Sequence, residues 1–105
     1  MEISQLREMV EEDPEDVLLR YSLGRKLLED MDGDPKEAVI HLCAVLETEP
    51  RHVAAMLALG QAYMRVGKDD EARETLEAGL EATRGLSHAE GEDLGPEFEK
   101  LLAEI

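Results

Sequence analysis

Apolar residues recur along the chain three or four positions apart, in runs separated by short polar stretches. Between residues 14 and 30 they stand at Val17, Leu19, Leu23, Leu27 and Leu28. This spacing follows one face of an α-helix, because a half-buried strand would alternate apolar and polar residues. A second helical stripe follows Asp34 and Pro35, and two more cover residues 53–66 and 69–83. The pattern predicts an all-α protein.

Two of the expected helices begin with recognisable capping residues. Asp13 is placed to cap the first of them, with Pro14 at the first helical position. Asp34 and Pro35 repeat this arrangement for the next helix. Glu37 follows Asp34 by three residues, which predicts a capping box at this second start.

The chain repeats itself with one irregularity. The dipeptide Leu-Gly occurs at residues 23–24 and again at 59–60, a shift of 36. The segments GDPKEA (33–38) and GKDDEA (67–72) are related by a shift of only 34. The first unit is therefore two residues longer than the second, between Leu27 and Gly33. We interpret the acidic stretch LEDMDGDPKEA (28–38) as a lengthened turn between two helices.

The repeated positions resemble the tetratricopeptide repeat, whose pattern is W-x₂-L-G-x₂-Y…A-x₃-F…P. The second unit carries this pattern as Met56, Leu59, Gly60, Tyr63, Ala72 and Leu76, and the first carries it as Arg20, Leu23, Gly24, Leu27, Ala38, Leu42 and Pro50. Both tryptophan positions depart from the pattern, leucine replaces an aromatic residue three times, and Arg84 replaces the final proline. The glycines and alanines still fall where helices must approach closely. The resemblance covers residues 16–84.

The resemblance implies a right-handed superhelical array of antiparallel helix pairs, an α-solenoid like the small stand-alone bacterial members of the family. A single domain, residues 1–105, would contain an N-terminal capping helix (1–13), two repeats (14–50 and 51–84) and a C-terminal capping helix (85–105). The last helix is expected to begin near Pro96, or at Ser87 with a kink at Pro96. Its apolar residues should face the array: Leu94, Phe98, Leu101, Leu102 and Ile105.

The acidic charge of the chain makes some classes of binding partner unfavourable. Asp and Glu total 26 against 11 Lys and Arg, which gives a formal net charge of −15. Such a surface repels phosphate backbones and anionic lipids, so we expect neither nucleic acid nor a membrane as the partner. No apolar stretch is long enough to span a bilayer, and Cys43 is the only cysteine. A cytoplasmic location is expected, with the acidity serving solubility or, alternatively, a high-salt cytoplasm.

Candidate chemistry is sparse. The acidic turn fails the register of a calcium loop, because a start at Asp30 puts His41 at the twelfth position instead of glutamate. His41 and Cys43 lie two apart on a helix and so cannot share a metal ion. Cys43 is expected to be partly buried and inert. No nucleophile elbow or phosphate loop is present. We therefore expect no enzyme activity, no cofactor and no metal.

The resemblance implies that the first helix of each repeat lines a concave groove that binds a peptide segment. Mapping by offset from each Leu-Gly gives the candidate groove residues Leu18, Tyr21, Arg25, Leu28, Leu57, Gln61, Met64 and Arg65. The expected function is a scaffold for a protein or peptide partner. The alternative is a self-associating unit, a homodimer formed through the groove or the C-terminal helix.

Leu57 and Met64 lie seven residues apart and so share one helix face, which differs from the face of Met56 and Tyr63. We expect these two residues to contribute to partner binding more than to folding. The alternative is that they pack against neighbouring helices.

Overall fold

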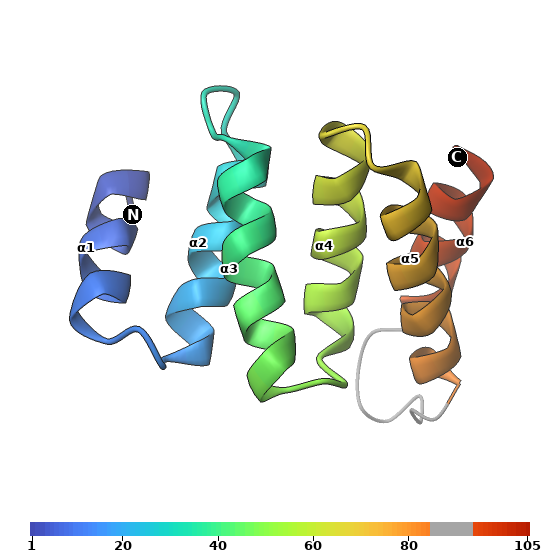
Figure 1. The fold of residues 1–105 in the computed structure, drawn as a ribbon, viewed down its shortest axis with the longest axis horizontal. Coiled ribbons are helices and arrows are strands. Elements are labelled where there is room, and N and C mark those ends of the chain that lie inside the picture. The colour runs from blue at the N-terminus through green and yellow to red at the C-terminus, as the bar shows by residue number, and fades with distance from the viewer. Residues whose placement is uncertain (85–93) are drawn as a thin grey trace.

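The computed structural model describes residues 1–84 and 94–105, and this part of the chain contains helices and no strands (Figure 1). The helices are α1 (Ile3–Glu12), α2 (Val17–Glu29), α3 (Pro35–Thr48), α4 (Val53–Arg65), α5 (Asp69–Thr83) and α6 (Gly95–Ala103). Successive helices run antiparallel and pack side by side, α2 with α3 and α4 with α5 (Figure 1). The predicted all-α helical repeat is confirmed.

The helices form an inner and an outer layer. Besides the contacts between successive helices, α2 contacts α4 and α4 contacts α6. No comparable contact within the described residues joins α1 to α3 or α3 to α5. The helices α2, α4 and α6 therefore lie closer to one another than α1, α3 and α5 do. This difference in spacing makes the face formed by α2, α4 and α6 the inner, concave side of the array.

The two extra residues of the first repeat lie in its turn, as predicted. Helices α2 and α4 have 13 residues each, while five residues separate α2 from α3 and only three separate α4 from α5. In the longer turn the Gly33 N–H donates to the Asp30 carbonyl at 3.0 Å. A Cβ on Gly33 would lie 2.0 Å from the Leu27 carbonyl oxygen, so only glycine fits there. The shorter turn instead relies on Gly67, at φ +80°.

The predicted start of α2 is wrong. The helix begins at Val17, and its cap is Asp16, whose side chain accepts a hydrogen bond from the Leu19 N–H at 3.1 Å. Asp13 instead ends α1, because its N–H donates to the Met9 carbonyl, and Pro14 lies in the turn that follows.

The other helix starts are partly as predicted. Asp34 caps α3 by accepting from the Lys36 N–H at 2.9 Å. The capping box with Glu37 is not formed, because the Glu37 carboxylate is taken by Arg7 of α1. His52 caps α4, its Nδ1 accepting from the Ala55 N–H at 3.0 Å, which the sequence did not suggest. Helix α6 begins next to Pro96 as expected, and the alternative start at Ser87 lies outside the described residues.

The helices approach most closely at glycines. A Cβ on Gly24 would lie 2.8 Å from the Leu42 side chain, and one on Gly60 would lie 2.4 Å from Leu76. A third approach brings Gly79 of α5 against the ring of Phe98 in α6. Leu42, Leu76 and Phe98 are fully buried. In each of these three helix pairs, α2–α3, α4–α5 and α5–α6, a large side chain of one helix fills the space beside a glycine of the other.

The hydrophobic core has two parts. One part runs from α1 through α4 and contains the buried Leu6 and Val10 of α1, so this first helix packs against the repeats. The other part joins α4, α5 and α6 around Leu57, Leu76 and Phe98. The C-terminal residues expected to face the array all pack against this second part: Leu94, Phe98, Leu101, Leu102 and Ile105.

We predict that Gly79→Ala lowers stability although alanine has the higher helix propensity. The new methyl group would meet the Phe98 ring at 2.2 Å, and a rigid ring at the centre of the second core part cannot move aside cheaply. The free energy of unfolding should fall by about 1–3 kcal/mol, against a propensity gain of about 1 kcal/mol. Urea denaturation measures the change, with the exposed Glu77→Ala on the same helix as control. An unchanged or higher midpoint for Gly79→Ala would contradict the close packing of α6.

Candidate functional site

The inner face of α2 and α4 carries the candidate groove residues, and their exposure divides them into three groups. Leu18 is 70% exposed, and Arg25 and Arg65 are also exposed. Tyr21, Gln61 and Met64 are half-buried. Leu28 and Leu57 are buried, at 5% and 7% exposure. The face open to solvent is therefore smaller and more polar than the sequence suggested.

On the α2 part of this face, the polar side chains are joined to one another by a hydrogen bond and an ion pair. Arg25 donates to the Tyr21 hydroxyl at 3.2 Å and pairs with Glu29 at 3.2 Å. Partial burial acts to lower the pKa of Arg25, but the Tyr21 hydroxyl and the Glu29 carboxylate raise it overall, so the guanidinium stays charged. The Tyr21 ring also lies 4.9 Å from the His52 ring at the start of α4. These contacts hold Tyr21 and Arg25 in fixed positions.

A surface hollow of about 450 Å³ opens beside these residues, between α1 and α2. It is lined by Met1, Leu6, Tyr21, Ser22, Arg25, Lys26 and Glu29. Its walls combine an aliphatic side chain, an aromatic ring and two cationic groups.

Arg65 joins the two inner helices. Its guanidinium donates to the Leu28 carbonyl, which lies in the last turn of α2. The last carbonyl groups of a helix have no partner within it, so Arg65 satisfies one of them. The side chain therefore has a structural role in addition to its exposure on the inner face.

The expectation that Leu28 and Leu57 line an open groove is corrected by their burial. Leu57 packs with Leu76 and Phe98 in the second core part, and Met64 packs against the same cluster. Leu57 and Met64 do share one face of α4, but the neighbouring α6 covers that face. Leu28 is likewise buried in the first core part, at the side of α2 that meets α4. Side chains of α2 and α4 that face the next inner helix are therefore buried in the contacts between these helices.

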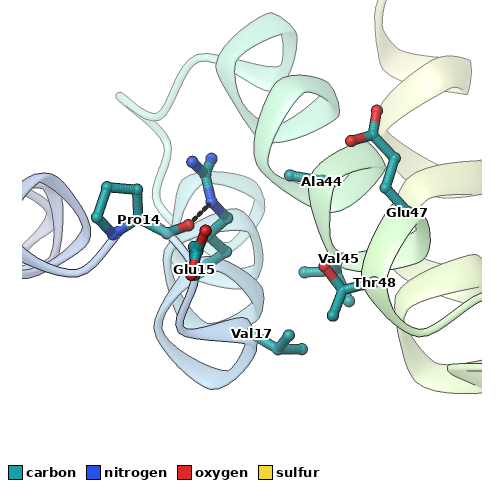
Figure 2. A pocket seen from close by; sticks show the side chains of 8 residues that line it. Pro14, Glu15, Val17, Ala44, Val45, Glu47 and Thr48 are labelled. Atoms are coloured by element: carbon teal, nitrogen blue, oxygen red, sulfur yellow. Dashed lines mark hydrogen bonds between the residues drawn. The ribbon is translucent and has the colours of Figure 1, made fainter.

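A second polar cluster, on the outer side, joins α1, α2 and α3. The Arg7 guanidinium makes a two-pronged pair with the Glu37 carboxylate, at 2.9 and 2.6 Å. His41 lies 3.3 Å from both Glu37 and Arg20, and Arg20 also donates to the Pro14 carbonyl at 2.6 Å (Figure 2). All four charged or titratable side chains satisfy one another. This cluster fastens α1 to α3.

The hydrogen bonds and the burial of this cluster shift the pKa values of Glu37 and His41. The hydrogen bond from Arg7 lowers the pKa of Glu37 below its ordinary value. Burial lowers the pKa of His41, which outweighs the opposing effect of Glu37. The neutral imidazole can then donate to Glu37 and accept from Arg20. A hollow of about 390 Å³ lies at its edge, where Pro14 and Val17 face the last turns of α3 (Figure 2).

The acidic turn has structural roles. Asp30 pairs with Lys26 at 3.5 Å, and Asp34 caps α3. In residues 1–84 and 94–105, no three His, Cys, Asp or Glu side chains are grouped so that they could hold a metal ion. None of the helices described there is long and apolar enough to cross a membrane. Cys43 is half-buried, and its sulfur lies 3.6 Å from the Tyr63 hydroxyl.

Paired antiparallel helices of repeated sequence, stacked in two layers with an exposed inner face, define a helical-repeat protein. A family model for the tetratricopeptide repeat matches residues 31–105. The TPR repeat-containing protein PA0015 of Pseudomonas aeruginosa is 35% identical over 94 residues, which cover 88% of each chain. The chain belongs to the tetratricopeptide repeat family. Repeats of this family generally mediate protein–protein interaction.

We predict opposite outcomes for two leucine truncations. Leu57→Ala should lower the free energy of unfolding by about 2–5 kcal/mol, because it leaves a cavity between α4 and α6. Leu18→Ala, the same chemical change on the inner face, should alter it by no more than about 0.5 kcal/mol, because Leu18 is 70% exposed. Urea denaturation of both variants checks this. Equal effects would show that Leu57 is not part of the core.

We further predict that His41 makes stability depend on pH. Its pKa in the folded chain lies below 6.5, so the unfolded chain binds the proton first and stability falls as the pH drops below 6.5. Glu37, with a pKa below 4.5, contributes stability above that pH and loses it only in stronger acid. In His41→Gln the unfolding midpoint should vary less between about pH 8 and about pH 5. Identical pH profiles for wild type and variant would contradict this assignment.

Proposed function

We propose that this protein is a non-enzymatic scaffold that binds a segment of a partner protein along its inner face. The observation that carries the proposal is an exposed aliphatic side chain on the concave layer, Leu18, close in sequence to the fixed Tyr21–Arg25 pair. An apolar side chain left 70% exposed in the first turn of a helix gains free energy if a partner covers it. Family membership supports the same function.

The proposed binding residues follow from exposure. Leu18 supplies apolar contact area, and Tyr21 supplies the edge of an aromatic ring held by Arg25 and His52. Arg25 of α2 and Arg65 of α4 supply guanidinium groups, and Gln61 supplies a half-buried amide one turn before Arg65 on α4. Aromatic and arginine anchors of this kind dominate the binding energy of many interfaces. Leu28 and Leu57 have no place in this set.

The charge of the chain argues against the homodimer. Two copies would each bring a formal net charge of −15, and like charges repel at the short distances of an interface. A partner with fewer acidic residues meets a smaller barrier. We therefore propose a different protein as the occupant of the inner face.

The proposal predicts a specific loss of partner capture. Wild-type protein, Leu18→Gln/Arg25→Gln and Ile40→Gln are immobilised and used to capture binding proteins from native lysate, with identification by mass spectrometry. Ile40 is a matched control because it is 64% exposed but lies on α3, in the outer layer. The double variant should weaken capture about tenfold, the effect of about 1.4 kcal/mol, while the control retains it.

Helicity and Tm of the three proteins should agree, because all the altered side chains are exposed. Equal capture by the double variant and the wild type would refute binding on the inner face. Light scattering at several concentrations gives a second check. A wild-type dimer that Leu18→Gln/Arg25→Gln dissociates would show that the inner face binds its own copy.

A further inference from the structure

A second apolar surface lies on the outer side of the molecule, between α3 and α5. Because these two helices do not contact each other, the α4 side chains beneath them remain accessible. Two adjoining hollows, of about 350 and 310 Å³, share Tyr63 as part of their lining. We call this surface the outer furrow and define it by its lining residues: Lys36, Val39, Leu46, Met56, Tyr63, Val66, Lys68, Glu71, Glu74, Thr75 and Ala78.

The repeat provides an internal comparison for the outer furrow. The shifts of 36 and 34 residues relate it to the corresponding gap between α1 and α3. That first gap is spanned by the Arg7–Glu37 pair, with Arg20 and His41 beside it. Leu27, at the position of Tyr63, is fully buried there. The first gap is therefore closed by side chains of this chain.

At the positions of the outer furrow that correspond to this cluster, the two arginines are replaced by uncharged residues, whereas the glutamate is present in both gaps. Cys43 stands in place of Arg7, and Met56 in place of Arg20. Glu71 stands in place of Glu37. Within residues 1–84 and 94–105, no cationic side chain pairs with Glu71 or with the neighbouring Glu74. The furrow thus presents a carboxylate pair at the edge of a half-exposed apolar floor.

Tyr63 lies at the centre of the floor, because it lines both hollows. The Tyr63 hydroxyl lies 3.6 Å from the Cys43 sulfur, which fixes the ring against α3. Burial, Cys43 and the two nearby glutamates raise the pKa of Tyr63 to about 12, so the hydroxyl is neutral at physiological pH. Met56 and Leu46 complete a floor of flexible and branched apolar side chains. A neutral aromatic ring beside carboxylates is a favourable place for a guanidinium group, which can stack on the ring while it pairs with the acids.

We propose that the outer furrow binds a basic segment of a partner protein, in which an arginine or lysine accompanies an apolar anchor. The basic group takes the role that Arg7 has in the first gap and pairs with Glu71 and Glu74. The apolar anchor covers Met56 and Tyr63. Lys36 and Lys68 line the other hollow of the furrow, which contains neither glutamate, and they disfavour a basic residue there.

The charge of the furrow selects this occupant over a second copy of the chain. A second copy carries a formal net charge of −15 and would bring mostly acidic side chains to Glu71 and Glu74. A basic segment instead gains from the attraction of the whole acidic surface during encounter and from the local pair once bound. This surface is separate from the inner face, so the two proposals stand or fall independently.

The test uses a displayed library of random short peptides, selected on the immobilised full chain. Enriched peptides should share an arginine or lysine next to a large apolar residue. The affinity of a synthetic peptide with that consensus is then measured by fluorescence anisotropy. Glu71→Gln/Glu74→Gln should weaken it by about tenfold, the size of one charge-assisted hydrogen bond. Glu8→Gln/Glu99→Gln removes the same charge from exposed sites on α1 and α6 and should have little effect.

A second variant tests whether an arginine of the chain itself can occupy the furrow in place of the peptide. Cys43→Arg rebuilds the pair of the first gap inside the furrow, since residue 43 corresponds to Arg7 and Glu71 to Glu37. It should abolish peptide binding while helicity is retained. If Cys43→Arg does not fold, the exposed glutamate variants decide the question alone.

Three results would overturn the proposal. One is a consensus without basic residues, and another is equal binding by Glu71→Gln/Glu74→Gln and the wild type. The third is a wild-type dimer in sedimentation that the same glutamate variant dissociates. Leu18→Gln/Arg25→Gln should leave the peptide affinity unchanged, so failure on the inner face is distinguishable from failure in the furrow.

Discussion

The structure depends on the close approach of helices at glycines that lack a Cβ. Gly24 and Gly60 let the second helix of each repeat lie against the first, with Leu42 or Leu76 in the space of the missing methyl group. Gly79 does the same for Phe98 of the last helix. Because a packed interior cannot absorb even one additional methylene without strain, these contacts fix the distance between helices. The layers, the faces and the spaces between them all follow from that distance.

Two surfaces of different character result. The inner helices contact one another and bury the side chains between them, as α6 buries Leu57 of α4. What remains on the inner face is a short row around Leu18, Tyr21 and Arg25. Outer helices that do not touch leave gaps over the inner layer instead. In one gap the pair of Arg7 with Glu37 closes the space, and the other stays open.

The comparison between the two gaps shows that the two repeats keep one fold while their outer side chains differ. The packing positions of both units are small or aliphatic, because the helix spacing demands it. The positions at the outer edge of each gap face no such demand and differ between the two units, where Cys43 and Met56 correspond to Arg7 and Arg20. The first unit has a cluster of mutually paired side chains around His41. In the second, Glu71 and Glu74 pair with no cation of residues 1–84 and 94–105, an arrangement suited to intermolecular pairing.

The sequence alone determined the helical class, the repeat and the lengthened turn, because these depend on local spacing and on small residues at fixed offsets. It could not decide between Asp13 and Asp16 as the cap of α2, since either side chain can accept the same kind of hydrogen bond. It also could not decide that Leu57 is buried, because an apolar residue on a helix face has the same pattern whether a neighbouring helix or a partner covers it. Only the position of α6 against α4 settles that point. The engagement of Glu37 by Arg7, thirty residues away, was likewise decided by tertiary structure, since no local pattern encodes which distant cation reaches a carboxylate.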